Sequence, residues 1–351
     1  MEELTSIDRS RNIISRFGLD ASQHEISRFG SGHINLTYRV SGKTDLILQR
    51  INIKVFTEPE VIAKNLRLAA SYFQSHFPGY RFLSCIPSVS GLDLEYDDEG
   101  YPWRVFPYIE NSVTYDQVDT TEQARQAARE FARLTRYLDG IDTSLFKPTI
   151  EHFHDLSTRW AQFDEALKNA SAVSRSAAAH AIAGCQAAHT LVDRYQKLIA
   201  GSSLRLRIIH NDTKINNVLF DRTTGRTIAV IDLDTLMPGY FIYDLGDMVR
   251  TFVCPVSEEA ADLARIVFRR DVYRGLLEGY LSEMDPVLTP EEKAAIPFAG
   301  KMMTYIMSLR FLADYLRGNT YYNITYPEQN LVRATNQLKL LEVLDANIPG
   351  A

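Results

Sequence analysis

The chain has 351 residues, which is too long for one small core and favours two lobes or domains. Hydrophobic residues make up 45% and charged residues 23% of the sequence, as is ordinary for globular proteins. The net charge of −6 argues against non-specific binding to nucleic acid or to an anionic membrane, although it allows a local basic pocket for a phosphate.

The first third of the chain predicts a small, mostly β lobe. Apolar residues at helical spacing indicate a helix over residues 5–17, and Gly18 is placed to end it. Residues 25–52 favour a strand hairpin, with a glycine pair, Gly30 and Gly32, in its first half. The sequence then predicts a helix over 58–76 and short strands over 82–89, 92–95 and 103–109.

Helical patterns dominate after Glu110. The elements expected here are helices over 121–138, 151–169 and the alanine-rich 173–199, β segments over 206–209 and 227–231, and a helical tail from about residue 257. We therefore predict an N-terminal lobe over residues 1–108 and a C-terminal lobe over residues 109–351, with a short hinge at their boundary.

The cysteines and the apolar segments point to a cytoplasmic protein. The three cysteines are far apart and form no CxxC pair, so neither a disulfide framework nor a zinc site is expected. The first residues lack the basic and apolar regions of a signal peptide. The apolar stretch near residues 302–316 is interrupted or bounded by charged residues, which favours a core helix over a membrane span.

The strongest chemical signal is the run HNDTKINN over residues 210–217, followed by IDLD over 231–234. Transfer of a phosphoryl group needs a carboxylate beside the attacking hydroxyl, a cation near the γ-phosphate and oxygen ligands for a divalent metal. These residues are of the right types, and we assign them as follows: Asp212 and Lys214 as catalytic residues, and Asn217 and Asp232 as metal ligands.

The spacing of these residues resembles the catalytic loop of the protein-kinase-like superfamily, in its aminoglycoside phosphotransferase branch. More narrowly, the segments HNDTKINNVLFD, VIDLDTLMPG and YDLGDMVRT resemble N-acetylhexosamine 1-kinases, and the likeness runs from Gly30 to about Tyr322. The resemblance implies a bilobal α+β fold of the protein-kinase-like type, with a small β-rich N-terminal lobe that binds ATP and a larger helical C-terminal lobe that binds the acceptor. It also implies Mg²⁺ as the cofactor and ATP as the co-substrate.

On the nucleotide side, Gly30 and Gly32 would belong to a loop that covers the phosphates, because glycine lets backbone N–H groups approach phosphate oxygens. The third glycine of the protein-kinase pattern is replaced by Asn35. Where a protein kinase carries a lysine on the next strand, this chain has Gln49, with Arg50 beside it. The sequence leaves open which of these two side chains contacts ATP.

On the acceptor side, the resemblance implies sugar contacts at His33, Arg310 and Tyr321. An arginine can donate two hydrogen bonds to sugar oxygens, and a tyrosine ring can stack on a pyranose face. The alternative for Arg310 is an ion pair with Asp314 on the same helix.

Four further polar residues near the motif favour supporting roles. We expect His210 to support the loop by packing and hydrogen bonding rather than to carry a proton. Asp234 is either a second metal ligand or a structural acid, and Asp244 and Asp247 are expected to support the loop or to cap a helix.

The sequence therefore predicts an ATP-dependent transferase of carbohydrate metabolism that phosphorylates the anomeric hydroxyl of an N-acetylhexosamine. One alternative is a kinase of another small hydroxyl compound, such as an aminoglycoside, homoserine or a choline-like amine. A second alternative is a nucleotide-binding regulator without catalysis, which the complete set of motif residues disfavours. The expected partners are a small-molecule sugar and ATP, without nucleic acid or membrane, and the oligomeric state is left open.

Overall fold

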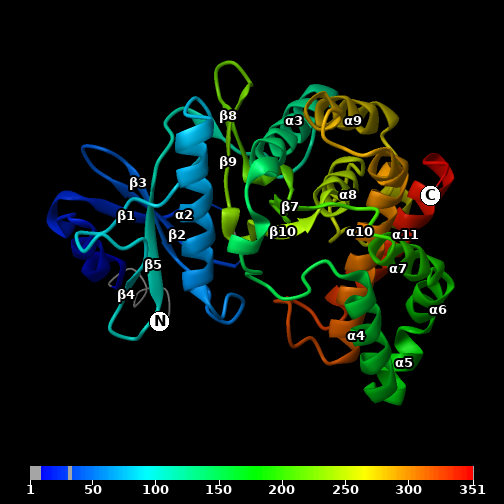
Figure 1. Ribbon diagram of the computed structural model, residues 1–351. Coiled ribbons are helices and arrows are strands. Elements are labelled where there is room, and N and C mark those ends of the chain that lie inside the picture. Colours follow the sequence, from blue (N-terminus) through cyan, green and yellow to red (C-terminus); the bar gives the residue numbers. More distant parts are fainter. Residues whose placement is uncertain (1–8, 31–33, 351) are drawn as a thin grey trace. The chain divides into compact units, whose positions relative to one another are not determined.

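The structure is a computed structural model that describes residues 9–30 and 34–350 (Figure 1). The chain forms two compact units. The first unit comprises Met1–Val113, Gly140–Glu151 and Phe220–Met237, and the second comprises Thr114–Asp139, His152–Leu219 and Pro238–Ala351. The predicted division into functional lobes at residue 108 stays a prediction.

An antiparallel five-stranded sheet of order β1-β2-β3-β5-β4 forms the centre of the first unit. Its strands are β1 (Glu25–Arg28), β2 (Leu36–Ser41), β3 (Leu46–Arg50), β4 (Glu95–Tyr96) and β5 (Pro102–Pro107). Alternate residues of β2 and β3, among them Tyr38, Val40 and Leu48, are buried in its hydrophobic core, as the two-residue period of a strand requires. The chain enters this sheet through a helical segment, residues 9–17, which ends at Gly18 with φ +75° as expected.

Helix α2 (Pro59–His76) is the long helix of the first unit (Figure 1). It begins with Pro59, a residue suited to the first helical turn. Its buried Asn65 donates hydrogen bonds to the backbone oxygens of Lys147 (2.8 Å) and Leu236 (3.0 Å). Asn65 therefore fixes α2 to the two later segments that belong to the same unit.

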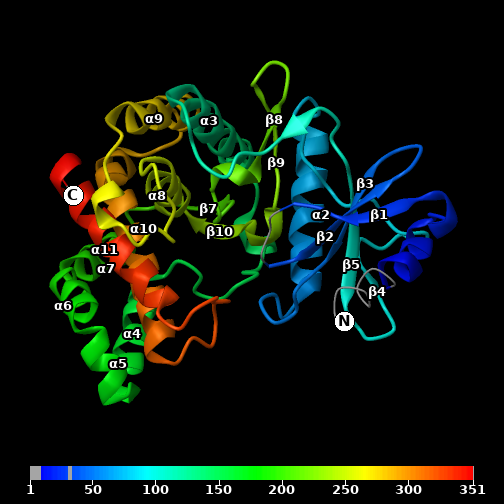
Figure 2. The ribbon, with the colours of Figure 1, turned by 180° about the vertical axis from the view of Figure 1, so that it is seen from behind.

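The second unit is mostly helical, which confirms the predicted α+β class with a β-rich N-terminal and a helical C-terminal region. Figure 2 shows its helices from behind. They are α3 (Thr121–Tyr137), α4 (Leu156–Asn169), α5 (Ala172–Ala177), α6 (Ala179–Ala187), α7 (Thr190–Ala200), α8 (Phe241–Phe252), α9 (Arg270–Met284), α10 (Pro290–Leu316) and α11 (Gln329–Asn347). The long apolar α10 is buried along most of its length, as expected of a core helix. A Cβ at Gly279 of α9 would lie 2.0 Å from the Arg125 backbone oxygen, so this glycine permits the close approach of α9 to α3.

Several predicted elements were wrong in whole or in part. The strand expected over 92–95 is reduced to β4, and the first α-helix of the expected helical tail begins at Arg270 rather than near residue 257. Residues 82–89 form no strand apart from one bridge between Ile86 and Val105, and Pro87 removes the next backbone donor. The alanine-rich segment 173–199 is three helices rather than one, because the backbone leaves helical geometry at Ala178 and Ala188. Alanine favours helix but does not fix where a helix ends.

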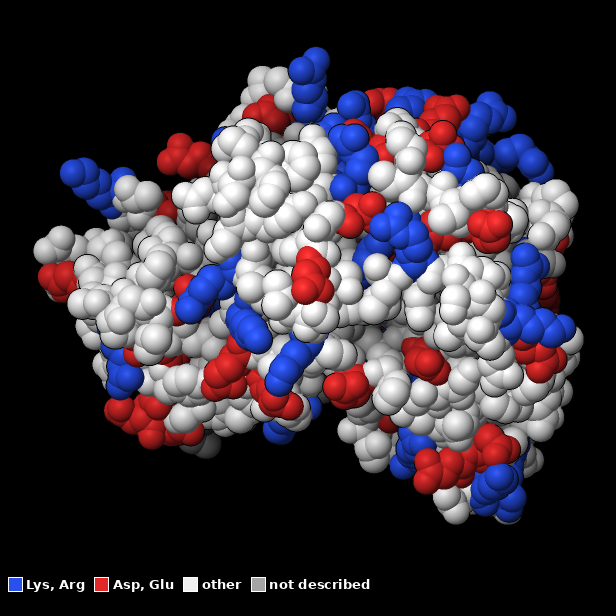
Figure 3. Space-filling view, in the orientation of Figure 1, with Lys and Arg blue, Asp and Glu red and all other residues white. Residues whose placement is uncertain are grey.

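Acidic and basic residues are interspersed on the face of the molecule drawn in Figure 3. Within the second unit, Arg129, Arg133 and Arg136 of α3 all form ion pairs with Glu283 of α9. In the described part of the chain, no helix is long and apolar enough to cross a membrane.

Candidate active site

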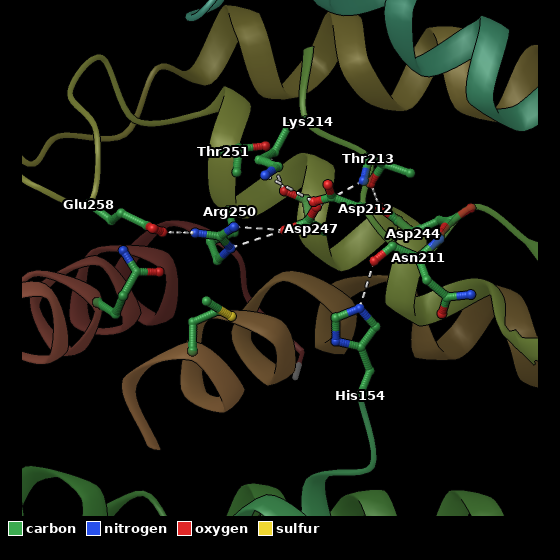
Figure 4. A network of polar contacts seen from close by, with 12 residues as sticks. His154, Asn211, Asp212, Thr213, Lys214, Asp244, Asp247, Arg250, Thr251 and Glu258 are labelled. Atoms are coloured by element: carbon green, nitrogen blue, oxygen red, sulfur yellow. Dashed lines mark hydrogen bonds and ion pairs between the residues drawn. The ribbon is translucent and has the colours of Figure 1, made fainter. Parts of the chain in front are cut away.

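The loop 210–217 lies in the second unit between β7 (Leu206–Ile209) and the start of β8 (Val218–Asp221), and acidic side chains of α8 accept hydrogen bonds from it (Figure 4). Asp244 accepts hydrogen bonds from the backbone N–H groups of His210 (3.0 Å) and Asn211 (2.7 Å). Asp247 accepts one from the backbone N–H of Thr213 (2.9 Å). The supporting role expected for the two acids of α8 is therefore confirmed.

These contacts bend the loop so that Asp212 and its neighbours face one another. Asn211 has a positive φ of 65°, a conformation that asparagine tolerates better than most residues. The Asp212 carboxylate lies 3.2 Å from the Lys214 ammonium and accepts a hydrogen bond from the Asn217 side-chain amide at 3.1 Å. The structure thus brings together the three predicted site residues of this loop.

The electrostatics of the loop keep Asp212 ionised. Burial acts to raise the pKa of Asp212, but the positive charge of Lys214 and its hydrogen bonds hold the pKa below its usual range. In contrast, burial raises the pKa of Asp244 to about 6. Burial also raises the pKa of Asp247, and the positive charge of Arg250 partly offsets this increase. At neutral pH Asp212 is therefore a carboxylate that can accept a hydrogen bond from a hydroxyl.

Two histidines of the second unit support the loop. His210 is fully buried, meets the Phe131 ring edge-on, and its Nδ1 accepts the backbone N–H of Asp212 at 3.1 Å, as expected of a supporting residue. His154 was not predicted. Its Nε2 donates to the Asn211 backbone oxygen at 2.8 Å (Figure 4), and its Nδ1 has no hydrogen-bond partner among the described residues.

His154 remains neutral because burial, together with the charge of Arg310, lowers its pKa to about 3. A base with a folded pKa below its unfolded value of 6.5 takes up its proton mainly on unfolding, so it lowers the stability as the pH falls below 6.5. The amide of a glutamine at position 154 can still donate to Asn211. We therefore expect His154→Gln to remove a pH dependence of the free energy of unfolding of about 1 kcal/mol per pH unit between pH 6.5 and 5.

Denaturant unfolding of the wild type and of His154→Gln at several pH values measures the two free energies of unfolding. Subtracting one from the other cancels the opposite contribution of Asp244, which both proteins share. The exposed histidine of α6 supplies the control His180→Gln, which should keep the wild-type pH dependence. Identical slopes for wild type and His154→Gln would contradict the neutral buried state of His154.

The predicted nucleotide-side residues lie in the first unit. Gly30 has φ +77°, a conformation that favours glycine, whereas Gly32 and His33 lie outside the described residues. Gln49 donates to the Thr37 hydroxyl at 3.1 Å and accepts from Arg104. Arg50 stacks on the Tyr101 ring with its guanidinium carbon 4.4 Å from the ring centre, and successive strand residues point to opposite faces.

Asp232 and Asp234 also belong to the first unit but differ in exposure. Asp232 follows β9 (Thr227–Val230), has φ +56° and is exposed. Asp234 is buried and is paired with Arg104 and Asn35. This arrangement supports the structural alternative for Asp234.

The residues proposed for the metal suit a hard cation such as Mg²⁺. The Asn217 amide nitrogen donates to the backbone oxygen of Asp212 at 2.8 Å and to its carboxylate, which leaves the Asn217 amide oxygen pointing elsewhere. The described ranges contain no group of three or more His, Cys, Asp or Glu side chains that could hold a metal ion. A metal would therefore need ligands from elsewhere, and nucleotide phosphates are the usual ones.

Two of the three predicted acceptor residues, Arg310 and Tyr321, lie in the second unit, whereas the third, His33, lies outside the described residues. The Arg310 guanidinium carbon lies 5.1 Å from the centre of the Phe153 ring and 5.6 Å from that of Tyr322. Tyr321 is 57% exposed and meets Tyr322 edge-on. In the part of the chain that is described, no carboxylate lies within ion-pair distance of Arg310.

Asp314 is committed elsewhere, so the alternative of an Arg310–Asp314 ion pair is not observed. The Asp314 carboxylate accepts the backbone N–H groups of Tyr321 (2.8 Å) and Tyr322 (3.0 Å), which shapes the loop that presents both rings. A second arginine, Arg159, lies close by and was missed by the sequence analysis. It donates to the Phe153 backbone oxygen at 2.7 Å, and burial together with the charge of Arg310 lowers its pKa to about 10.

The chain is similar to known phosphotransferases in its family pattern and in its fold. A model of the phosphotransferase enzyme family matches residues 25–279. A microcompartment-associated aminopropanol kinase superposes with a TM-score of 0.67 at 17% identity, over 96% of each chain. An aminoglycoside phosphotransferase from Alicyclobacillus acidocaldarius gives 0.63 at 11% identity, over 97% of this chain and 96% of that one. An amicoumacin kinase in complex with AMP-PNP and Ca²⁺ gives 0.60 at 16% identity, over 99% and 97%.

Proposed function

Because the chain belongs to the phosphotransferase enzyme family and is a small-molecule kinase, we propose that its acceptor is an N-acetylhexosamine phosphorylated on the anomeric hydroxyl. The products would be ADP and the sugar 1-phosphate. We further propose that it acts in the cytoplasm, in carbohydrate metabolism, and with Mg²⁺ as the metal.

The observation that carries this proposal is the surroundings of Arg310. A guanidinium close to two aromatic rings, with no ion-pair partner among the described carboxylates, suits a neutral polar acceptor whose oxygens accept hydrogen bonds. A cationic acceptor such as an aminoglycoside or a choline-like amine would be repelled by Arg310 and Arg159. His154 interacts with both these arginines and the loop 210–217, because it donates a hydrogen bond to Asn211, and its pKa is lowered by burial and by the charge of Arg310.

We assign the chemical roles as follows. Asp212 orients the acceptor hydroxyl and takes its proton, and Lys214 offsets negative charge near the transferred phosphoryl group. An anomeric hydroxyl is more acidic than other sugar hydroxyls, so an ionised carboxylate with a low pKa is a sufficient base. Asn217 and Asp232 would hold the metal, which would supply positive charge against the phosphates. Gly30, Gly32 and Gln49 are assigned to the nucleotide, and His33, Arg310 and Tyr321 to the sugar.

We expect Arg310→Ala and Tyr321→Ala to raise the KM for the sugar by about tenfold or more, because each removes contacts made to the acceptor in both ground and transition states. The KM for ATP should change by less than about twofold, since neither residue is assigned to the nucleotide. Steady-state kinetics with each substrate varied in turn measures the two constants.

Arg317→Ala is the matched control, because this arginine ends the same helix and contacts Gln162 instead of the Arg310 cluster. It should leave both KM values near those of the wild type. Equal increases in both KM values for Arg310→Ala, or a lower melting temperature with unchanged kinetics, would contradict an acceptor contact.

The names of the structural neighbours favour a second candidate, a kinase of an amino alcohol or an aminoglycoside. An ADP-release assay with N-acetylglucosamine, N-acetylgalactosamine, aminopropanol, choline and an aminoglycoside separates the two candidates. The proposed function predicts the highest kcat/KM with an N-acetylhexosamine. Turnover restricted to the cationic acceptors would replace it with the second candidate, and ATP binding without any turnover would favour a regulator.

A further inference from the structure

A buried arginine of the first unit, Arg104, lies opposite the strand position at which protein kinases carry a lysine. Protein kinases carry a phosphate-binding lysine on the third strand of the N-terminal sheet. In this chain that position is the uncharged Gln49, and the residue directly opposite it in the β3–β5 ladder is Arg104. Arg104 Nε and Nη2 donate to Gln49 Oε1 at 3.0 and 2.5 Å, so the two side chains form one unit on one face of the sheet.

Arg104 extends past Gln49 to the turn that follows β9. Its Nη2 lies 2.5 Å from Asp234 Oδ1, while the side-chain amide of Asn35 donates to Asp234 Oδ2 at 2.7 Å. The Asn35 oxygen in turn accepts the backbone N–H of Asn52 at 3.0 Å. Both oxygens of Asp234 are thus engaged, and the turn is connected to three separate segments of the sheet region.

The network contains a buried pair of opposite charges, Arg104 and Asp234. Arg104 and Asp234 are each 2% exposed, and a buried ion pair of this kind is costly unless it is well hydrogen-bonded. Burial acts to lower the pKa of Arg104, but the carboxylates of Asp234 and Asp232 hold it above its usual value. Arg104 Nη1 has no hydrogen-bond partner within the described ranges, so one donor of a buried cation is uncommitted.

The other arginines next to these strands do not offer the same charge. Arg39 of β2 pairs with Asp45 and stacks on the Tyr108 ring. Arg50 of β3 stacks on Tyr101. Arg104 alone among these three contacts the turn that carries Asp232.

We propose that Arg104 is a positioning residue for the metal–nucleotide complex: it supplies from β5 the positive charge that protein kinases carry on the neighbouring strand, and it acts through Asp234 on the turn that presents Asp232. The inference rests on the proposed function, because it assumes that the first unit binds ATP. It gives a physical reason for the uncharged glutamine at position 49 and for the buried pair of Arg104 and Asp234.

Arg104→Gln tests the charge. We expect it to raise the Kd for Mg·ATP and the KM for ATP by about tenfold or more, as the loss of a charge-assisted interaction does. The KM for the acceptor should stay within about twofold, because Arg104 is not assigned to the acceptor. Calorimetric titration with Mg·ATP and steady-state kinetics give these values, and Arg39→Gln on β2 is the matched control.

Arg104→Gln also leaves Asp234 buried without its partner, so two double variants separate charge from packing. Arg104→Gln with Asp234→Asn removes both charges and restores hydrogen bonding between neutral groups. Arg104→Gln with Gln49→Lys moves the cation to the position directly opposite in the β3–β5 ladder. We expect nucleotide affinity to return in the second double variant and to stay low in the first, with similar melting temperatures for both.

Recovery of nucleotide affinity in the variant without either charge would overturn the inference, because packing alone would then account for Arg104. Wild-type affinity in Arg104→Gln itself would also overturn it and would leave the proposed function intact. A wild-type chain that binds no Mg·ATP would overturn the proposed function and this inference together.

Discussion

Asp212→Asn is expected to lower kcat by at least ~100-fold, in the range attributed to general-base catalysis, while the Kd for ATP stays within about twofold. The substitution keeps the shape of the side chain and its contact with Asn217 but removes the negative charge that Lys214 holds ionised. An asparagine cannot take the proton of the acceptor hydroxyl. The loss should therefore fall on the chemical step, which single-turnover kinetics isolates.

The control for Asp212→Asn is Asp271→Asn, which removes the same charge from a side chain that is 81% exposed on α9. It should leave kcat unchanged. A kcat for Asp212→Asn close to that of the wild type would show that Asp212 is not the general base. A large loss of ATP affinity would instead assign Asp212 to nucleotide binding.

Asp232→Ala is expected to abolish measurable turnover and to weaken nucleotide binding only when a divalent metal is present. A carboxylate that binds a metal between phosphates contributes charge to both the ground state and the transition state, so its loss affects binding and catalysis together. Calorimetry with ATP, with and without Mg²⁺, separates the metal-dependent part of the affinity from the rest.

Asp232 has a positive φ, and alanine in this conformation costs on the order of 1 kcal/mol of strain. Asp232→Asn is therefore the companion variant, because asparagine tolerates the same backbone and lacks only the charge. Both variants should lose activity. Activity retained in Asp232→Asn with the wild-type dependence on Mg²⁺ would reject Asp232 as a metal ligand.

The loop of the candidate site could be predicted because its partners are close in sequence. Asp212, Lys214 and Asn217 lie within six residues, so the spacing alone fixes which side chains can meet. The metal assignments and the roles of Gly30, Gly32 and His33 remain predictions. Arg310 and Tyr321 were assigned to the acceptor from the family resemblance, and their role also remains a prediction.

The contacts that the sequence did not reveal join residues distant in the chain. His154 contacts Asn211 from 57 positions away, and Arg104 contacts Asp234 across 130 positions. Neither residue lies in a recognisable motif: His154 precedes a helix, and Arg104 lies in an otherwise apolar strand, where a buried arginine is rare. That rarity was the one available signal for Arg104, because a charged residue inside a buried strand requires a partner.

The prediction of secondary structure failed where the local preference of a segment and its tertiary pairing disagree. Residues 82–89 have strand composition, but their one β-bridge in the structure joins Ile86 to Val105, and Phe82 instead stacks on Phe73 of α2. A strand needs a neighbour, and the composition of a single segment does not state whether one is present.

The most direct test of the central claim is the identity of the product. The protein is incubated with Mg·ATP and N-acetylglucosamine or N-acetylgalactosamine, and the product is examined by phosphorus and proton NMR. The account predicts a new phosphate resonance coupled to the anomeric proton of the sugar, together with stoichiometric ADP. Phosphate on the 6-hydroxyl, or product formed only from an aminoglycoside or amino alcohol, would contradict it.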